Sequence, residues 1–298
     1  MSIIDEQLTD FILKHQLSKE YIQTADLHFT QLVNQIHTLK KAQPQSVVFI
    51  GINGCQGSGK STLADYLVTR LSTDHQYQAI TLSLDDFYLS SAKRQQLAHA
   101  VHPLLKTRGV PGTHDTEQLQ ETLAALATKH SNIAIPRFDK ATDNPLAKSE
   151  WPVLTSPMDI VILEGWCWGI PPQDLGKLQQ PINELECQFD PQSIWREYVN
   201  AALKRDYLPL YQYMHYWIML QAPSFNCVYR WRLEQEHKLR KSTTNSAKNN
   251  IMTDQEIAHF IEYFQRLTEH GLAVLPKEVD IVFQLDQTRK IASSLQKQ

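Results

Sequence analysis

The sequence contains no long hydrophobic run and no large excess of charge of either sign. No apolar stretch approaches the roughly 18 residues that a transmembrane helix needs, and the first 40 residues lack a basic start followed by an apolar segment. The chain has 29 basic and 32 acidic residues, so it has no overall positive field that would attract nucleic acid. These absences favour a soluble cytoplasmic protein that binds neither membranes nor nucleic acid.

Cysteine is scarce, and the four cysteines lie far apart in the sequence. None belongs to a C-x-x-C pair, which argues against a zinc site and against a disulfide framework. We expect reduced, partly buried thiols at these four positions, which are Cys55, Cys167, Cys187 and Cys227. The twelve histidines show no metal-binding spacing on a helical pattern.

Glycine is scarce too, but four of the ten glycines fall within residues 51–59, in the stretch GINGCQGSGKST. Gly54, Gly59, Lys60 and Ser61 satisfy G-x-x-x-x-G-K-[ST], directly after an apolar run and directly before a helical pattern. Glycines let the backbone N–H groups point inward, and the following helix adds its positive end, so the loop can cradle phosphates. A glycine-rich turn that binds nothing is the alternative, and the flanking strand and helix patterns disfavour it.

The loop predicts ATP and Mg²⁺ as ligands. We expect Lys60 to reach the β- and γ-phosphates and the Ser61 hydroxyl to contact Mg²⁺. The sequence lacks NKxD, the guanine-reading signature, which favours ATP over GTP. The loop residues expected around the nucleotide are Gly54, Cys55, Gln56, Gly57, Ser58, Gly59, Lys60, Ser61 and Thr62.

The rest of the chain alternates short apolar runs with helical patterns, which predicts a doubly wound α/β sheet. Five or six buried parallel strands are expected, at residues 46–52, 78–84, 132–138, 159–165, 216–222 and 280–286. Apolar residues at helical spacing predict two amphipathic helices within residues 1–40. The apolar residues that show this spacing are Ile22, Ala25, Phe29, Val33 and Ile36. The polar segment 240–250 is expected to be a mobile loop.

Asp85 and Asp86 follow the second expected strand, in the stretch LSLDDFYLS. Ligands bind at the carboxyl edge of an open α/β sheet, so a carboxylate there could accept the proton of an acceptor hydroxyl and help to hold the metal. Aspartate is also common as a helix cap or in a turn, and the position alone does not separate these roles.

Several stretches of the chain resemble a known family. GCQGSGKS followed by LDDFY is similar to the phosphoribulokinase, uridine kinase and pantothenate kinase group. RGVPGTHD (108–115), IPRFDKATD (135–143) and VILEGWCWG (161–169) resemble the D-glycerate 3-kinase branch, and the similarity covers most of the chain from residue 46 onward. The resemblance implies a P-loop NTPase fold of three layers around a central, mostly parallel five-stranded sheet with a helical lid. It also implies that Asp85 acts as the catalytic base.

The expected organisation is one P-loop kinase domain, with residues 46–298 as the nucleotide- and acceptor-binding core and residues 1–45 as a helical extension. Covering the core is the simpler role for the extension, and a dimer contact is the other. The sequence leaves open whether the protein is a monomer or a homodimer.

Several charged residues outside the loop are candidates for binding the acceptor. Arg108 and His114 flank a rigid Gly-Val-Pro-Gly turn, where they could grip a small anion. Asp115 begins a helical pattern with Gln118 three residues on, which favours an N-cap. The resemblance supports acceptor contacts for Arg137, Asp139 and Lys140, and Tyr88 is assigned to the same site. Beyond residue 143 the chain lacks a longer Gly- and Arg-containing segment of the glycerate kinases, so part of this pocket could differ.

Glu164 ends an apolar strand, where burial without a partner is costly, so we expect it to orient Mg²⁺ or to contact the substrate. The segment YRWRLEQEHKLRK places basic residues on a helix after the next strand. In the family the equivalent helix is a lid whose arginine closes over the transferring phosphate, which assigns Arg232 to catalysis and Arg230 to the nucleotide. Arg240 and Lys241 are further candidates, and a merely solvated helix face is the alternative.

Together these features predict an ATP-dependent kinase for a small hydroxyl compound, with D-glycerate as the acceptor. A nucleoside, pantothenate or a sugar phosphate as acceptor remains the nearest alternative. A nucleotide-binding switch or assembly factor that grips a protein partner is the alternative from another class.

Overall fold

The computed structural model describes residues 3–242 and 253–297, which form an α/β fold around a six-stranded sheet. The sheet has the order β10-β9-β8-β1-β7-β2. Its strands are β1 (Val48–Gly54), β2 (Ala79–Ser83), β7 (Ile160–Gly165), β8 (Tyr216–Gln221), β9 (Ile281–Leu285) and β10 (Ile291–Gln296). The first five run parallel and β10 runs antiparallel to β9, so the expected fold class is confirmed.

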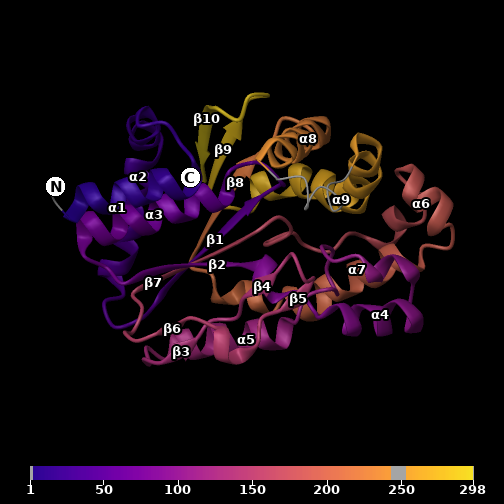
Figure 1. Ribbon diagram of the computed structural model, residues 1–298, viewed down its shortest axis with the longest axis horizontal. Helices are drawn as coiled ribbons and strands as arrows, with labels where there is room; N and C mark the ends of the chain where they lie inside the picture. Colours follow the sequence, from indigo (N-terminus) through magenta and orange to yellow (C-terminus); the bar gives the residue numbers. More distant parts are fainter. Residues whose placement is uncertain (1–2, 243–252, 298) are drawn as a thin grey trace.

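Helices cover both faces of the sheet (Figure 1). On one side lie α1 (Ile3–His15), α2 (Glu20–Ala42) and α3 (Lys60–His75), and on the other lie α5 (Thr116–Ala127) and α7 (Ile194–Ala202). The remaining helices are α4 (Ser91–Ala100), α6 (Glu184–Phe189), α8 (Phe225–Ser242) and α9 (Asp254–Val274). No helix in the described ranges combines the length and the apolar character needed to cross a bilayer.

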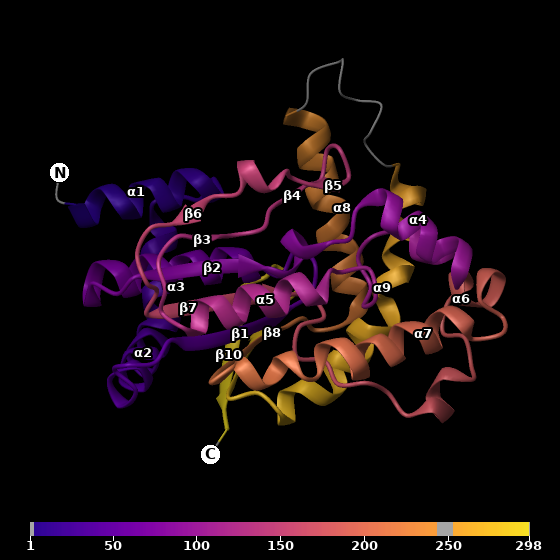
Figure 2. The same ribbon diagram turned by 90° about the horizontal axis from the view of Figure 1, so that it is seen from below.

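The strand predicted at residues 132–138 is not part of this sheet. It is divided between β3 (Ile133–Ala134), which pairs with β6 (Val153–Leu154), and β4 (Phe138–Asp139), which pairs with β5 (Asn144–Pro145). Pro136 interrupts the run, and proline cannot donate a hydrogen bond within a central strand. Figure 2 shows this segment passing outside the main sheet.

Strand β10 was not predicted from the sequence, because its side chains after Ile291 are all exposed and no apolar run marks it.

The structure also bears on the expected helices, cysteines and loop. Four of the five apolar residues that predicted the helices near the start of the chain are buried in α2, and Ile22 is half-buried. All four cysteines are free thiols, of which Cys187 is exposed rather than partly buried. Most of the loop expected at 240–250 lies outside the described residues.

Strand order and register place the polar ends of three strands together. The chain passes from β1 through α3 to β2, but β7 lies between β1 and β2. Glu164 on β7 is in register with Ile52 on one side and with Ser83 on the other. The carboxyl edge of the sheet therefore brings the glycine loop, Glu164 and Ser83 to one place, as expected for an open α/β fold.

Candidate active site

The glycine loop joins β1 to α3 and leaves the first turn of that helix uncapped. Gly57 and Gly59 have φ values of 77° and 92°, in the left-handed region that side chains other than glycine disfavour. At Gly54 an added Cβ would lie 2.5 Å from Ser58 Oγ. Gly59 is the N-cap of α3 and has no side chain that could accept from the first N–H groups of the helix. Unsatisfied N–H groups at a helix N-terminus form an anion site, so this geometry suits a phosphate.

Glu164 lies against this loop and is 3% exposed. Its Oε1 accepts hydrogen bonds from the hydroxyls of Ser61 and Ser83, both at 2.9 Å. Its Oε2 lies 3.7 Å from Lys60 Nζ and has no hydrogen-bond partner. A buried carboxylate oxygen without a hydrogen bond is costly, so it marks a place where a cation or donor belongs.

These residues fit Mg²⁺, which prefers oxygen ligands and is usually held by one or two carboxylates together with substrate phosphates. The Ser61 hydroxyl and the open Oε2 of Glu164 would supply the protein's oxygens. Within the described ranges no three His, Cys, Asp or Glu side chains form a cluster that could hold a metal alone. The arrangement therefore suits a metal that arrives with a nucleotide.

Asp85 lies at the start of a short 3-10 helix, η1 (Leu84–Phe87), but its side chain does not cap it. Ser83 is the N-cap and accepts from the Asp85 N–H at 3.3 Å. The Asp85 carboxylate instead accepts from the hydroxyl of Tyr88 at 2.8 Å and from Lys140 Nζ at 2.7 Å. The carboxylate is thus free of the capping role and faces cationic and hydroxyl donors.

Lys60 and Asp85 influence each other's charge. Burial opposes the Lys60 ammonium, but the carboxylates of Glu164 and Asp85 outweigh burial and raise the pKa of Lys60. Burial by itself would raise the pKa of Asp85, but Lys140 and Lys60 lower it to about 2. Both groups are therefore charged at neutral pH.

The hairpin of β4 and β5 carries two of the cations predicted to bind the acceptor, and each is paired with a carboxylate of η1. Arg137 donates to Asp86 at 3.1 Å, and Lys140 pairs with Asp85 as described above. The pKa of Asp86 is raised, because burial outweighs the neighbouring Arg137. The structure thus brings the hairpin cations to the edge of the sheet where Asp85 lies.

Asp139, on the same hairpin, is not brought into this group. Its carboxylate accepts from the N–H groups of Ala141 and Thr142 and from the Thr142 hydroxyl, at 2.9, 3.2 and 2.7 Å. These bonds close the hairpin turn, as aspartate side chains commonly do. We therefore assign Asp139 to the turn rather than to the acceptor.

Arg108 reaches the hairpin from the loop before α5. Its guanidinium lies 5.7 Å from the centre of the Phe138 ring and pairs with the Asp143 carboxylate. The other oxygen of Asp143 accepts from the buried Arg94 at 2.5 Å. Asp143 thus holds two arginines side by side.

His114 is buried beside Tyr88, which donates to Asp85. Its ring stacks on Tyr88 with the centroids 4.4 Å apart, and its Nδ1 lies 2.6 Å from the Tyr207 hydroxyl. Its Nε2 is buried and has no partner. Burial lowers the pKa of His114 to about 3, against the opposing charge of Asp85, so the ring is neutral. The next residue, Asp115, accepts from Gln118 N–H at 3.1 Å and is the N-cap of α5, as predicted.

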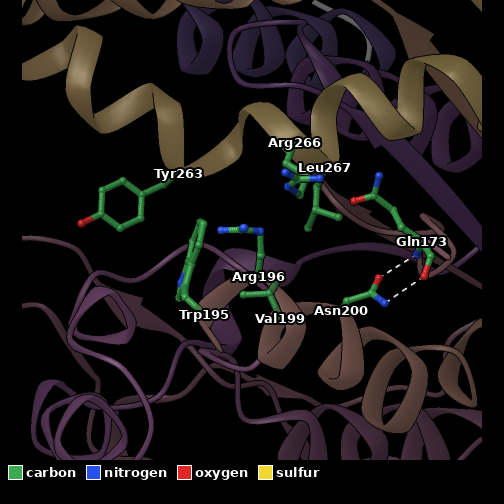
Figure 3. Close-up of a pocket in the computed structure, with 8 residues that line it drawn as sticks. All are labelled: Gln173, Trp195, Arg196, Val199, Asn200, Tyr263, Arg266 and Leu267. Atoms are coloured by element: carbon green, nitrogen blue, oxygen red, sulfur yellow. Dashed lines mark hydrogen bonds between the residues drawn. The ribbon is translucent and has the colours of Figure 1, made fainter. Parts of the chain in front are cut away.

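A second group of buried arginines, on α7 and α9, lines a small cavity (Figure 3). Arg196 pairs with Asp190 at 2.9 Å and Arg266 pairs with Glu186 at 2.6 Å. The cavity beside them measures about 10 Å³, which is room for about one water molecule. Its lining residues are Gln173, Trp195, Arg196, Val199, Asn200, Tyr263, Arg266 and Leu267. These arginines are structural, because no substrate fits there.

The chain is similar in sequence to known kinases, although no protein-family model matches it. An uncharacterized kinase of Schizosaccharomyces pombe, mug58, is 34% identical over 255 residues, which span 81% of this chain and 87% of the relative. The chloroplastic D-glycerate 3-kinase of Arabidopsis thaliana is 30% identical over 72% of this chain and 45% of its own length. The chain belongs to the P-loop kinase family.

A solved structure supports the same assignment. The D-glycerate 3-kinase of Cryptococcus neoformans var. grubii has a TM-score of 0.71 to this chain at 26% identity, and the superposition covers 89% of this chain and 99% of that one. The pantothenate kinase of Shewanella denitrificans is 31% identical over 43% of this chain, and the uridine kinase of Ureaplasma parvum is 26% identical over 41%. The family resemblance that the motifs indicated is therefore confirmed.

In this P-loop kinase the two arginines assigned to the lid lie on α8. Arg230 donates to Gln287 Oε1 at 3.3 and 3.4 Å and to Cys227 Sγ at 3.2 Å, so it is turned toward the loop between β9 and β10 rather than toward residues 54–62. Arg232 is half-buried. The side chains of Arg240 and Lys241 lie outside the described residues.

Four residues of the candidate site were not predicted from the sequence. Ser83 binds Glu164, Asp143 and Arg94 hold Arg108, and Tyr207 binds His114. Ser83 could have been found, because it is a hydroxyl at the end of a strand that precedes the aspartates. The other three had no local signal. Tyr207 lies on a π-helical turn (Leu203–Tyr207), an irregularity that is frequent near functional sites.

Proposed function

We propose that the protein transfers the γ-phosphate of ATP to a hydroxyl of a small anionic acceptor, with D-glycerate as the acceptor and 3-phosphoglycerate as the product. The observation that carries the proposal is the joint position of the glycine loop, Glu164 and Asp85 at one edge of the sheet. The names of the glycerate kinase relatives support the choice of acceptor.

On the nucleotide side, the N–H groups of the uncapped first turn of α3 and the Lys60 ammonium would bind the phosphates. Ser61 and Glu164, with Asp85 nearby, would hold Mg²⁺, which neutralises charge on the β- and γ-phosphates when it is bound. The charged Lys60 would balance the negative charge that spreads over the γ-phosphoryl oxygens during transfer. Arg232 on α8 is proposed to add a second cation when the lid closes, which would also exclude water.

On the acceptor side, Asp85 is proposed to orient the attacking hydroxyl and to take its proton as the phosphoryl group arrives. A carboxylate with a pKa of about 2 is a weak base, so we expect Lys140 and Tyr88 to turn toward the acceptor on binding and to release Asp85. The pKa of Asp85 would then rise, because burial would no longer be opposed by Lys140.

The charges around this pocket favour an acceptor with one negative charge. Four cations meet three carboxylates there: Arg94, Arg108, Arg137 and Lys140 against Asp85, Asp86 and Asp143. The excess of one cation suits a carboxylate such as that of glycerate, and Arg108 offers it a fork of donors. His114 lies next to Tyr88 and would contact the acceptor through Nε2.

The test is a coupled ADP-release assay with D-glycerate, L-glycerate, uridine, pantothenate and ribulose 5-phosphate, each compared with no acceptor. D-glycerate is expected to give the highest kcat/KM, with 3-phosphoglycerate identified by mass and NMR spectra. Turnover with another acceptor alone would refute glycerate but keep the kinase. If no small hydroxyl compound stimulates ATP consumption, the kinase proposal itself is wrong.

One variant tests whether Asp85 is the catalytic base. Asp85→Asn is expected to lower kcat by about 10²- to 10⁴-fold, the usual contribution of a general base, while the Kd of ADP measured without Mg²⁺ stays within about threefold. Asp174→Asn is the matched control, because Asp174 is exposed and its side chain makes no capping bond. If Asp85→Asn keeps more than about a tenth of the wild-type kcat, Asp85 is not the base.

A further inference from the structure

Helix α1 lies along α3, the helix that begins at the glycine loop (Figure 1). Phe11 is buried between them, with its ring centre 6.1 Å from that of Tyr66. At the end of α1, Lys14 and His15 both contact Asp65 of α3, at 2.7 and 2.8 Å. Phe11 thus supplies the apolar contact, and the last two residues of α1 supply a polar one.

The polar contact continues from His15 to the glycine loop side of α3. His15 Nε2 lies 2.8 Å from Asp65 Oδ2, and His15 Nδ1 lies 3.3 Å from the hydroxyl of Thr62. An ionised carboxylate can only accept, so Nε2 carries the proton toward Asp65. In the neutral ring Nδ1 is then the acceptor for the Thr62 hydroxyl. Asp65, His15 and Thr62 form a connected chain between the two helices.

Thr62 belongs to the turn that the proposed nucleotide site uses. It follows Ser61, whose hydroxyl binds Glu164, and it precedes Leu63, whose N–H bonds the carbonyl of Gly59 at 2.9 Å. The N–H groups before Leu63 have no side-chain cap. A bond that fixes the Thr62 side chain therefore restricts the same turn whose N–H groups would face phosphates.

We propose that His15 is a positioning residue for the nucleotide, and that α1 acts as a clamp that preorganises the first turn of α3 for binding the phosphates. This inference rests on the proposed function to the extent that residues 54–62 bind a nucleotide. His15 touches neither nucleotide nor acceptor, and it acts through Thr62. The clamp gives the helices at the start of the chain a role in ATP affinity beyond covering the core.

The test measures Mg·ADP binding by isothermal titration calorimetry on full-length variants. His15→Leu keeps an apolar contact but loses both hydrogen bonds, so the Kd of Mg·ADP is expected to rise about five- to tenfold. His15→Gln can still accept from Thr62 and donate to Asp65, so it is expected to stay within about twofold of wild type. The KM for the acceptor is expected to be unchanged in both.

Two controls separate positioning from simple packing. Lys14→Met removes the other partner of Asp65, and its effect should be within about twofold, because Lys14 is 67% exposed and exposed ion pairs contribute little. In a Thr62→Val background, His15→Leu should add no more than about twofold, because the two residues act as one unit.

Each outcome of these measurements supports or overturns the proposed clamp. An unchanged Kd for His15→Leu, a loss in His15→Gln as large as that in His15→Leu, or full additivity with Thr62→Val would overturn the clamp while leaving the kinase proposal intact. Wild-type protein that fails to bind Mg·ADP would overturn both.

Discussion

Replacing Glu164 with glutamine tests the core of the site with little change in shape. The amide oxygen can still accept from Ser61 and Ser83, which now hold Oε1 at 2.9 Å. What disappears is the negative charge 3.7 Å from Lys60 Nζ. Since Glu164 is the first of the carboxylates that raise the pKa of Lys60 against burial, that pKa should fall in the variant.

The effect on stability should be modest. Removing one partner of a buried ion pair typically costs about 3–5 kcal/mol. Here the Lys60 side chain is 17% exposed and Asp85 remains as a second anion, so we expect a loss of about 1–2 kcal/mol in the free energy of unfolding. The effect on catalysis should be larger, about 10²- to 10³-fold in kcat, as for loss of a preorganised electrostatic contact.

The assay combines thermal unfolding with the coupled ADP-release measurement at saturating and limiting Mg²⁺. Glu197→Gln on α7 is the control, because that side chain is exposed. We expect the Glu164 variant to need more Mg²⁺ for half-maximal rate, since Glu164 is proposed to help hold the ion. A kcat within about threefold of wild type at the same Mg²⁺ requirement would refute the role of Glu164.

Two further predictions concern the acceptor side. Lys140→Met should raise the pKa of Asp85 from about 2. The ionised Asp85 stabilises the fold at pH values above 3.8, its ordinary pKa, and this contribution is lost as the pH falls toward 2. Acid unfolding, followed by circular dichroism, should therefore begin at a higher pH in the variant. An unchanged midpoint would contradict the pairing of Lys140 with Asp85. Tyr207→Phe should cost about 1–3 kcal/mol, because His114 Nδ1 loses its partner, and should also raise the acceptor KM. Tyr211→Phe, which loses a bond to a backbone carbonyl, should lower stability alone, so equal KM values in the two variants would argue against His114 as an acceptor contact.

The sequence was most informative where the residues of the candidate site are consecutive. The glycine loop and its lysine are local in the chain, and Glu164 could be predicted because a charged residue ends an otherwise apolar strand. The prediction of a central strand at 132–138 was wrong, because Pro136 interrupts the short apolar run on which it was based. The grouping of Arg108 with Asp143 depends on how the hairpin of β4 and β5 packs, and no pattern along the chain records it. The contact of His15 with Thr62 likewise joins two helices whose periodicity indicates only an apolar face.

The place of β7 in the sheet has a consequence for how the protein is made. In the finished sheet β1 and β2 do not touch, because β7 separates them, although β7 is synthesised after both. A nascent chain that has emerged only as far as β2 therefore holds Lys60 and Ser61 but lacks the carboxylate that pairs with them. Such distant pairings form slowly, so we expect the phosphate cradle to mature late, when β7 inserts between its neighbours.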